Sequence, residues 1–287
     1  YIVPMLPGRG PDGRGRAQTW DWPENVVERT PDELRREPVD VVILQRPHEY
    51  ALVRRWLRRT PGVDIPAVYL EHNTPKESVT NMRHPARDYT NVAVAHVTHF
   101  NALFWDCGDV PTYVVEHGVI DPGYHYTGEV PCAAAVINEA RRRGRVTGTD
   151  LLERFDRSVG VDLFGMDARA LGGIENLPQD KLHRDLARRR LYLHPVRWTS
   201  LGLSLIEAMF LGMPVVALAT TEVPRAVDGC GITSTSVADL VDGCKALVRD
   251  ERRAREMGRD GRERARRQFG LQRFLNDWNQ ILAEVSV

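Results

Sequence analysis

Short apolar runs alternate with amphipathic stretches along this chain, and such alternation predicts parallel strands joined by helices. The predicted strands are residues 1–6, 39–44, 67–70, 92–97, 112–116, 133–138, 161–165, 191–193 and 215–219. The predicted helices are residues 31–37, 49–59, 101–106, 150–157, 179–188, 200–211, 237–249, 251–269 and 272–287. We therefore expect an α/β protein whose sheets are mostly parallel.

The most informative stretch is residues 191–227, which predicts a buried strand, a buried helix and a second buried strand. Ser200 is expected to begin the helix, because a serine hydroxyl accepts hydrogen bonds from the free amides of a first turn. Gly212 suits the left-handed conformation that ends a helix, and Pro214 prevents the helix from continuing. The all-apolar run after Pro214 is typical of a strand that is buried on both faces.

The predicted helix is apolar nearly all round, except for Ser200, Ser204 and Glu207. At about 100° per residue these three side chains form one narrow stripe. A buried glutamate needs partners, since burying an unpaired charge is costly. Glu207 either bonds a neighbouring backbone group or arginine, or accepts hydrogen bonds from a polar ligand. In the second case the helix start at Ser200, Leu201 and Gly202 would present free amides to an anion.

This stretch resembles the nucleotide-sugar site of GT-B glycosyltransferases of family 4, the retaining, glycogen synthase-like enzymes also called glycosyl transferases group 1. Their motif is a glutamate, seven residues and a second glutamate, followed by apolar and glycine positions. The residues that match in register are Gly202, Leu203, Glu207-Ala208-Met209, Gly212 and Pro214-Val215-Val216-Ala217. The resemblance implies a GT-B fold, with two Rossmann-like domains that face an interdomain cleft, and a nucleoside-diphosphate sugar as donor.

The resemblance also implies roles for individual residues. Glu207 corresponds to the glutamate that holds the ribose hydroxyls, and the phosphates would rest on Ser200, Leu201, Gly202 and Leu203. The first glutamate of the motif is replaced by Thr199, which lies where the family contacts the transferred sugar. His72 follows a predicted strand, as a family histidine near the sugar does. We expect His72 to donate a hydrogen bond to the sugar or to the developing phosphate charge.

Three arginines are candidates to compensate for residues that the family motif has and this sequence lacks. Arg143 and Arg145 lie in the predicted loop after residues 133–138, where the family lysine is replaced by Thr147. A guanidinium makes paired hydrogen bonds to phosphate, so both are candidate phosphate ligands, the alternative being solvated loop arginines. Arg197 flanks Thr199 and is a candidate to fill the space near the sugar; ordinary loop packing is the alternative.

The two alternating units meet near a predicted linker at Asp121-Pro122-Gly123. We expect an N-terminal acceptor-side domain at residues 1–123, a nucleotide-sugar-binding domain at residues 124–271, and a last helix at residues 272–287 that packs back on the first domain. The family opens with a strand and a glycine-rich loop. Tyr1 begins one unit later, so we expect the first unit to be missing from this sequence.

Composition narrows the function further. The chain has 287 residues and a formal net charge of zero, which gives no indication of binding to nucleic acid or to an anionic membrane. No apolar run is long enough for an integral membrane segment, and we expect no signal peptide. The four cysteines lack metal or redox spacing and suggest cytoplasmic thiols. Only three lysines accompany the arginines, which suggests a GC-rich, bacterial genome.

We therefore expect a metal-independent, hexosyltransferase-like enzyme that moves a sugar from a nucleoside-diphosphate donor to an unknown acceptor, without a cofactor. No His/Cys/Asp spacing suggests a metal site. In the family the leaving phosphate itself is thought to act as the base. Two alternatives remain: a nucleotide-sugar epimerase, which should need a cluster of carboxylates, and a non-catalytic relative that binds a sugar nucleotide or a partner protein, which Thr199 and Thr147 motivate.

Overall fold

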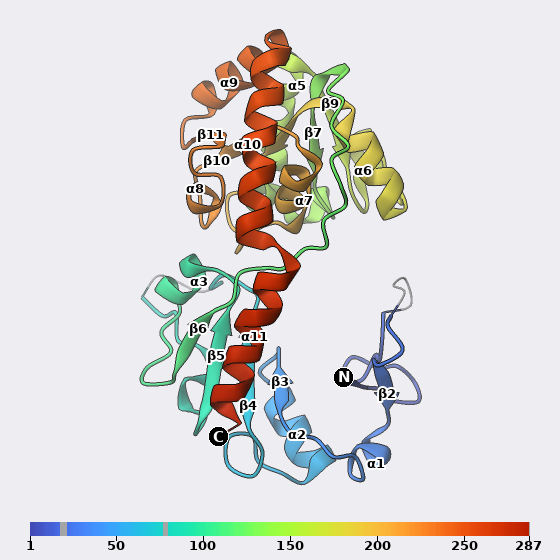
Figure 1. The fold of residues 1–287 in the computed structure, drawn as a ribbon, viewed down its shortest axis with the longest axis vertical. Helices are drawn as coiled ribbons and strands as arrows, with labels where there is room; N and C mark the ends of the chain where they lie inside the picture. Colours follow the sequence, from blue (N-terminus) through green and yellow to red (C-terminus); the bar gives the residue numbers. More distant parts are fainter. Residues whose placement is uncertain (18–21, 77–79, 287) are drawn as a thin grey trace. The chain divides into compact units, whose positions relative to one another are not determined.

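The computed structural model describes residues 1–17, 22–76 and 80–286 (Figure 1). The chain divides into two compact units, each described here by itself. Unit 1 comprises Tyr1–Val97, Ala102–Val114 and Trp278–Val287, and unit 2 comprises Thr98–Asn101 and Val115–Asp277. The chain therefore changes unit after Val97, after Asn101 and after Val114, and again after Asp277 within the last helix. The domain limits at residues 123 and 271, and the docking of the last helix, stay predictions.

Unit 1 contains a parallel sheet in the order β3-β4-β5-β6. Its strands are β3 (Val42–Leu44), β4 (Ala67–Glu71), β5 (Val92–His96) and β6 (Thr112–Val114), and its helices include α1 (Pro31–Leu34), α2 (Glu49–Leu57) and the 3-10 turn η1 (Pro85–Asp88). Ala67, Tyr69, Val92 and Val94 form the centre of its core, against which Tyr50 of α2 packs. Thr30 caps α1, and Glu33 completes a reciprocal capping box.

The first strand stands apart from this sheet. β1 (Ile2–Pro4) pairs in parallel with β2 (Val27–Arg29), a strand that the apolar pattern did not predict. β2 is only half-buried along its length and carries two charged residues in three positions, so no buried run marks it. Pairing with β1, rather than hydrophobicity, defines it.

Unit 2 is a three-layer α/β/α structure around a parallel sheet in the order β11-β10-β9-β7-β8. The strands are β7 (Val130–Val136), β8 (Val161–Phe164), β9 (Arg189–His194), β10 (Val215–Leu218) and β11 (Gly231–Ser234). Its helices are α4 (Ala140–Thr147), α5 (Leu152–Val159), α6 (Gln179–Ala187), α7 (Leu203–Leu211), α8 (Val223–Ala226), α9 (Val237–Arg249) and α10 (Glu251–Phe269), with 3-10 turns η2 (Thr149–Leu151) and η3 (Ala168–Leu171). Two further helices, α3 (His99–Phe104) and α11 (Leu271–Val285), begin in unit 2 and end in unit 1.

The alternation along β9 and β10 distributes side chains to two cores. Tyr192, Val215 and Ala217 face the core that includes α7 and part of α10, while Leu193 and Val216 face the core under α5 and α9. Both strands are therefore buried on both faces, as their continuous apolar runs predicted. Figure 1 shows α10 lying along one side of this sheet.

Several expected elements need correction. The helix predicted at 101–106 begins at His99 and ends at Phe104. The arginine-rich segment after β7 is not a loop but helix α4, which is kinked at Gly144, where φ is 43° and ψ is −114°. The sequence analysis also missed α8 and β11. By contrast, α9 and α10 have the predicted bounds, because their amphipathic periods and their caps Ser236 and Asp250 agree.

Candidate functional site

A cavity of about 500 Å³ lies at the carboxyl ends of the strands of unit 2. Its walls come from the segments that follow β7, β8 and β9 and from the first turns of α7. The strand order reverses between β7 and β9, which are neighbours although β8 lies between them in sequence. In open parallel sheets, crevices at such a reversal are where ligands bind, because the flanking loops diverge to opposite faces. The volume suits a small polar ligand.

The start of α7 forms one wall of this cavity. The expectation that Ser200 caps this helix is wrong: the N-cap is Gly202, without a side-chain cap, and the helix begins at Leu203. Ser200 is instead 4% exposed, and its Oγ accepts a hydrogen bond from Asn101 Nδ2 at 2.9 Å. Gly202, Leu203 and Ser204 line the cavity. An uncapped helix start in a cavity offers amides and partial positive charge to an anion.

Glu207 lies one turn further along α7 and lines the same cavity. Its side chain is 19% exposed. The carboxylate is held by α6: Gln179 Nε2 donates to Oε1 at 3.0 Å, and His183 Nε2 lies 3.7 Å from Oε2. Neither a backbone group nor an arginine binds it within the part of the chain that the structure describes, so the first interpretation of Glu207 offered above does not apply.

Arg143 supplies a cation to the cavity wall from α4. Its guanidinium makes no hydrogen bond or ion pair with any described residue, while the adjacent Glu139 is paired with Arg142. Thr147, which stands where the family has a lysine, also lines the cavity but is 2% exposed. Its hydroxyl donates to the Gly144 carbonyl at 3.2 Å. Arg143 is therefore the cation that a ligand would meet first.

Arg145 and Arg197 are not brought to the cavity. Both pair with Asp150: Arg197 Nη1 and Nη2 lie 2.6 and 3.0 Å from its two oxygens, and Arg145 Nη1 lies 3.2 Å away. The Arg197 hydrogen bond is the main cause that lowers the pKa of Asp150, so that carboxylate remains charged. Asp150 binds both guanidinium groups, and neither arginine lines the cavity with Arg143. Their assignment to the site stays a prediction.

The remaining wall combines small polar and apolar groups. Thr199 and Leu201 line the cavity after β9, beside the buried imidazole of His194. Tyr192 donates its hydroxyl hydrogen to Ser204 Oγ at 2.8 Å, which fixes the polar stripe of α7. His194, which the sequence analysis missed, is 2% exposed, and its Nε2 has no partner among the described residues. Burial lowers its pKa to about 4, so the ring is neutral at pH 7.

His72 belongs to unit 1, directly after β4. Its Nε2 lies 3.0 Å from Gln45 Oε1, and burial is the main cause that lowers its pKa. Because Gln45 Oε1 is an acceptor, Nε2 carries the proton in this contact. Beside it, the buried Glu71 carboxylate accepts from the Asn73 amide at 2.6 Å and orders the turn. A role for His72 toward a sugar stays a prediction from the resemblance.

Two features are absent from the described residues. No group of three or more His, Cys, Asp or Glu side chains is arranged to hold a metal ion among residues 1–17, 22–76 and 80–286. In the same residues, no helix is both long and apolar enough to cross a bilayer.

The region around this cavity is similar to known glycosyltransferases in sequence. Residues 173–264 match the family model described as Glycosyl transferases group 1. The match runs from the segment before α6 into α10 and so includes Thr199, the start of α7 and Glu207. A trehalose synthase of Rubrobacter xylanophilus is 34% identical over 85 residues, which is 29% of this chain and 20% of that protein. The matched region thus spans about a fifth of the length of this relative.

Solved structures extend the likeness over most of the chain. Sucrose-phosphate synthase from Thermosynechococcus elongatus has a TM-score of 0.69 at 12% identity, covering 86% of this chain and 73% of that one. HepE from Anabaena, in complex with UDP, has a TM-score of 0.66 at 15% identity, covering 90% and 86%. TarM from S. aureus, in complex with UDP and other ligands, has a TM-score of 0.64 at 17% identity, covering 84% and 55%.

These findings define the class. The fold is the α/β fold of GT-B glycosyltransferases, and residues 173–264 match the model of the glycosyl transferases group 1 family. At identities of 12–17% the structural likeness establishes fold alone. The chemistry has to be argued from the cavity.

Proposed function

We propose that this chain is a retaining, hexosyltransferase-like glycosyltransferase of family 4 that uses a nucleoside-diphosphate sugar as donor. One observation carries the proposal: an acidic side chain, an unpaired guanidinium and an uncapped helix start surround one cavity at the strand reversal of unit 2. Glu207, Arg143 and Leu203 supply these three groups. A nucleoside diphosphate presents a diol, which suits the carboxylate of Glu207, and two phosphates, which suit the guanidinium and the helix start.

In this proposal the diphosphate lies against the first amides of α7, with Arg143 beside it. When the bond between the sugar and the phosphate breaks, negative charge grows on the departing diphosphate. Fixed amides, a helix start and a guanidinium stabilise that charge without reorganising, and this is often a large catalytic contribution. The departing phosphate would act as base toward the acceptor hydroxyl, so the chain supplies no nucleophile. The proposal also gives His72 of unit 1 a hydrogen bond with a sugar hydroxyl.

The ribose would lie at Glu207, whose carboxylate accepts from the two hydroxyls. Glu207→Gln keeps the size of the side chain and removes its charge. We expect nucleotide binding to weaken by about 1.5–3 kcal/mol, the scale of a hydrogen bond to a charged group, with the fold preserved. Calorimetric titration measures the binding. Glu153→Gln on α5, which alters a 75% exposed carboxylate, is the matched control. Unchanged affinity with collapsed thermal stability would make Glu207 a structural residue instead.

Thr199 is the basis of a proposal about the sugar. Threonine is shorter than glutamate and uncharged, so it enlarges the sugar end and removes an acceptor. We propose a donor with a deoxy or N-acetylated hexose, and UDP as the first nucleotide to test because HepE and TarM were solved with UDP. Thr199→Glu should reduce turnover of the native donor while leaving UDP binding intact. Proton NMR of the product checks retention, and an inverted anomeric signal contradicts it.

One observation favours a second candidate, a non-catalytic sugar-nucleotide-binding relative. Arg197, which was a candidate to replace the lost glutamate, is held by Asp150 instead. Among the described residues that line the cavity, Glu207 is then the only carboxylate, and Thr199 lies beside Leu201 and the buried His194. Incubation with a panel of sugar nucleotides separates the candidates. Release of the nucleoside diphosphate, with sugar passed to water or acceptor, supports the transferase. A free 2-epimeric sugar indicates an epimerase, and binding without turnover indicates the non-catalytic relative.

A further inference from the structure

Helix α6 presents two nitrogen-bearing side chains to Glu207. Gln179 and His183 are four residues apart, so both lie on one face of this helix. α6 packs against α7 and β9, which brings this face to the carboxylate. Gln179 Nε2 donates to Oε1 at 3.0 Å, and His183 Nε2 lies 3.7 Å from Oε2. Each carboxylate oxygen is therefore addressed by a different side chain of the same helix.

The two contacts differ in a way that matters for a ligand. The 3.0 Å contact is a hydrogen bond, whereas 3.7 Å lies beyond hydrogen-bond range and within ion-pair range. Oε2 accepts no hydrogen bond from any residue between 80 and 286 or in the other described segments. Oε1 accepts one hydrogen bond, from Gln179, and has a second lone pair. A carboxylate held in this way keeps acceptor capacity on both oxygens, which is what the two hydroxyls of a ribose require.

His183 is itself unusual. The side chain is 9% exposed, and its Nε2 has no hydrogen-bond partner within the described chain. A buried imidazole nitrogen without a partner costs free energy, so a position that keeps one points to a role outside simple packing. Its nearest charged atom is the Glu207 carboxylate. The imidazole lies on the Oε2 side of the carboxylate, with its Nε2 3.7 Å from that oxygen.

We propose that Gln179 and His183 are positioning residues that fix the Glu207 carboxylate for the ribose of the donor nucleotide. The inference rests on the proposed function, because it assigns the ligand of Glu207 as a nucleotide ribose. Neither residue touches the sugar or the phosphates in this account. Both act through Glu207, so their effect must appear with nucleotides that carry the ribose hydroxyls and disappear with nucleotides that lack them.

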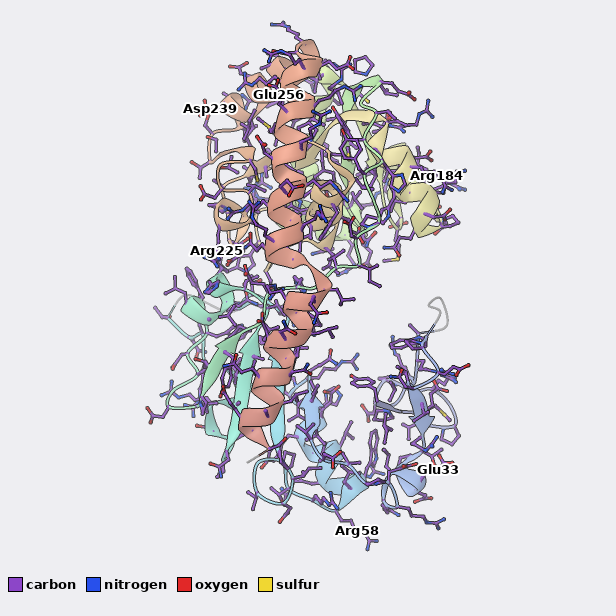
Figure 2. All side chains as sticks on the ribbon, in the orientation of Figure 1. Glu33, Arg58, Arg184, Arg225, Asp239 and Glu256 are labelled. Carbon is purple, nitrogen blue, oxygen red and sulfur yellow. The ribbon has the colours of Figure 1, made fainter. Side chains whose placement is uncertain are left out.

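The experiment compares UDP with 2′,3′-dideoxy-UDP by calorimetric titration of the whole chain. GDP or ADP and the matching dideoxy form replace them if the parent binds that nucleotide more tightly. The variants are His183→Leu, which fills similar space without nitrogen, His183→Gln, which restores an amide donor, and Gln179→Leu. Arg184→Gln is the matched control, since Arg184 follows His183 but is 60% exposed on the outer side of α6 and pairs with Asp180 (Figure 2).

We expect His183→Leu to weaken the ribonucleotide 5- to 30-fold and the dideoxynucleotide less than twofold. His183→Gln should recover most of that loss. Gln179→Leu, on an exposed position that the fold tolerates, should weaken the ribonucleotide about threefold to tenfold. Arg184→Gln should change neither ligand. Equal losses for both ligands would show a merely structural role and overturn the inference, as would unchanged affinities in all three variants.

The outcomes also separate this inference from the proposed function. If the parent binds none of UDP, GDP and ADP, the proposed function fails. If the parent binds the ribo and dideoxy forms equally, Glu207 does not hold the ribose, and this inference falls while sugar-nucleotide turnover still tests the transferase. If the parent prefers the ribo form and the His183 and Gln179 variants keep that preference, only the inference falls. Should His183→Leu not fold, His183→Gln and Gln179→Leu decide alone.

Discussion

The two units are both built on parallel sheets, but their strand orders differ. In unit 1 the order β3-β4-β5-β6 follows the chain in one direction, whereas unit 2 reverses direction between β7 and β9. Each unit has a cavity, of about 710 Å³ in unit 1 and about 500 Å³ in unit 2. The larger cavity is lined by Asn91, Val110 and Pro111, which precede β5 and β6, so it lies at the amino ends of the strands.

Charge separates the cavities further. Asp88, Asp109 and Glu284 line the cavity of unit 1, and its arginine, Arg87, is paired with Asp106. The cavity of unit 2 combines one carboxylate with the unpaired Arg143 and a helix start. Cavity size is therefore a poor guide to function in this protein. Position at a strand reversal and the sign of the local charge decide which cavity suits a nucleotide.

The largest expected effects come from one glycine in each unit. Gly148 (φ +73°) and Gly62 (φ +76°) have a left-handed backbone, and an added Cβ would lie 1.9 Å from the carbonyl oxygens of Pro195 and Thr90, respectively. Backbone strain and overpacking together should cost each alanine variant about 2–5 kcal/mol of unfolding free energy, measured by urea denaturation. Only Gly148→Ala should also weaken nucleotide binding to the folded protein. Gly148 follows Thr147 and Pro195 precedes Val196, so separating Gly148 from Pro195 displaces two residues that line the cavity.

Calorimetric titration of the folded variants with a nucleotide distinguishes the two glycines. If Gly62→Ala weakens nucleotide binding as much as Gly148→Ala does, then the difference drawn between the units is wrong.

Acid should affect both units alike. Burial is the main cause that lowers the pKa of His194 in unit 2 and of His96 in unit 1 to about 4, from 6.5. Above pH 6.5 both states of each histidine are neutral. As the pH falls from 6.5 to 4, the unfolded chain binds a proton that the native state does not. Each histidine therefore removes stability as the pH falls, by about 2 kcal/mol at pH 5 and about 3 kcal/mol at pH 4.

Urea denaturation at pH 7.5 and pH 5 tests this expectation. His194→Asn and His96→Asn should each reduce the acid-induced loss of stability relative to the parent, whatever they do to stability at pH 7.5. A variant whose loss between the two pH values equals that of the parent would show that its histidine is not the titrating group.

Within unit 2, Arg143 and Arg145 should behave differently. Arg143→Ala should weaken a nucleoside diphosphate by about 1.5–3 kcal/mol and the bare nucleoside hardly at all, because hydrogen bonds to phosphate are lost. Arg145→Ala should change either affinity less than twofold, since its side chain is 79% exposed and already pairs with Asp150. Calorimetric titration of both ligands measures this. Equal losses for diphosphate and nucleoside would remove Arg143 from the phosphate site.

The smallest effect is expected in the cavity of unit 1. The double change Asp88→Asn and Glu284→Gln removes two of its carboxylates without changing their size. We expect nucleotide affinity to stay within about 0.5 kcal/mol of the parent, the usual scale for surface changes away from a site. The same titration checks it. A larger change, of either sign, would mean that this cavity takes part in nucleotide binding.

Much of the fold follows from local pattern. The fully apolar runs of β9 and β10, the long amphipathic periods of α9 and α10, and the capping residue Thr30 each predict their elements without tertiary information. The polar stripe of α7 likewise marked Ser204 and Glu207 as cavity-facing residues. These signals survive because periodicity and caps act within a few residues.

The misses share a different cause. β2 has no apolar run and exists through its pairing with β1. The N-cap of α4 is Glu139 with φ of 53°, a conformation that no local rule favours for glutamate. Ser200 looked like a helix cap but is bonded to Asn101, a residue 99 positions away. Local propensity cannot anticipate such partners, because the free energy of a cap or strand also depends on distant groups.

The sequence by itself therefore determined the α/β class, most of the elements of unit 2, and the acidic position of the cavity at Glu207. Only the tertiary structure decided which arginine reaches that cavity, that Arg197 is held by Asp150, and that Gln179 and His183 meet Glu207 from another helix. The physical reason is the difference between local and long-range interactions along the chain. Periodicity records which face of an element is buried, whereas the partners of a charged side chain are chosen by whichever groups the folded chain brings within about 4 Å.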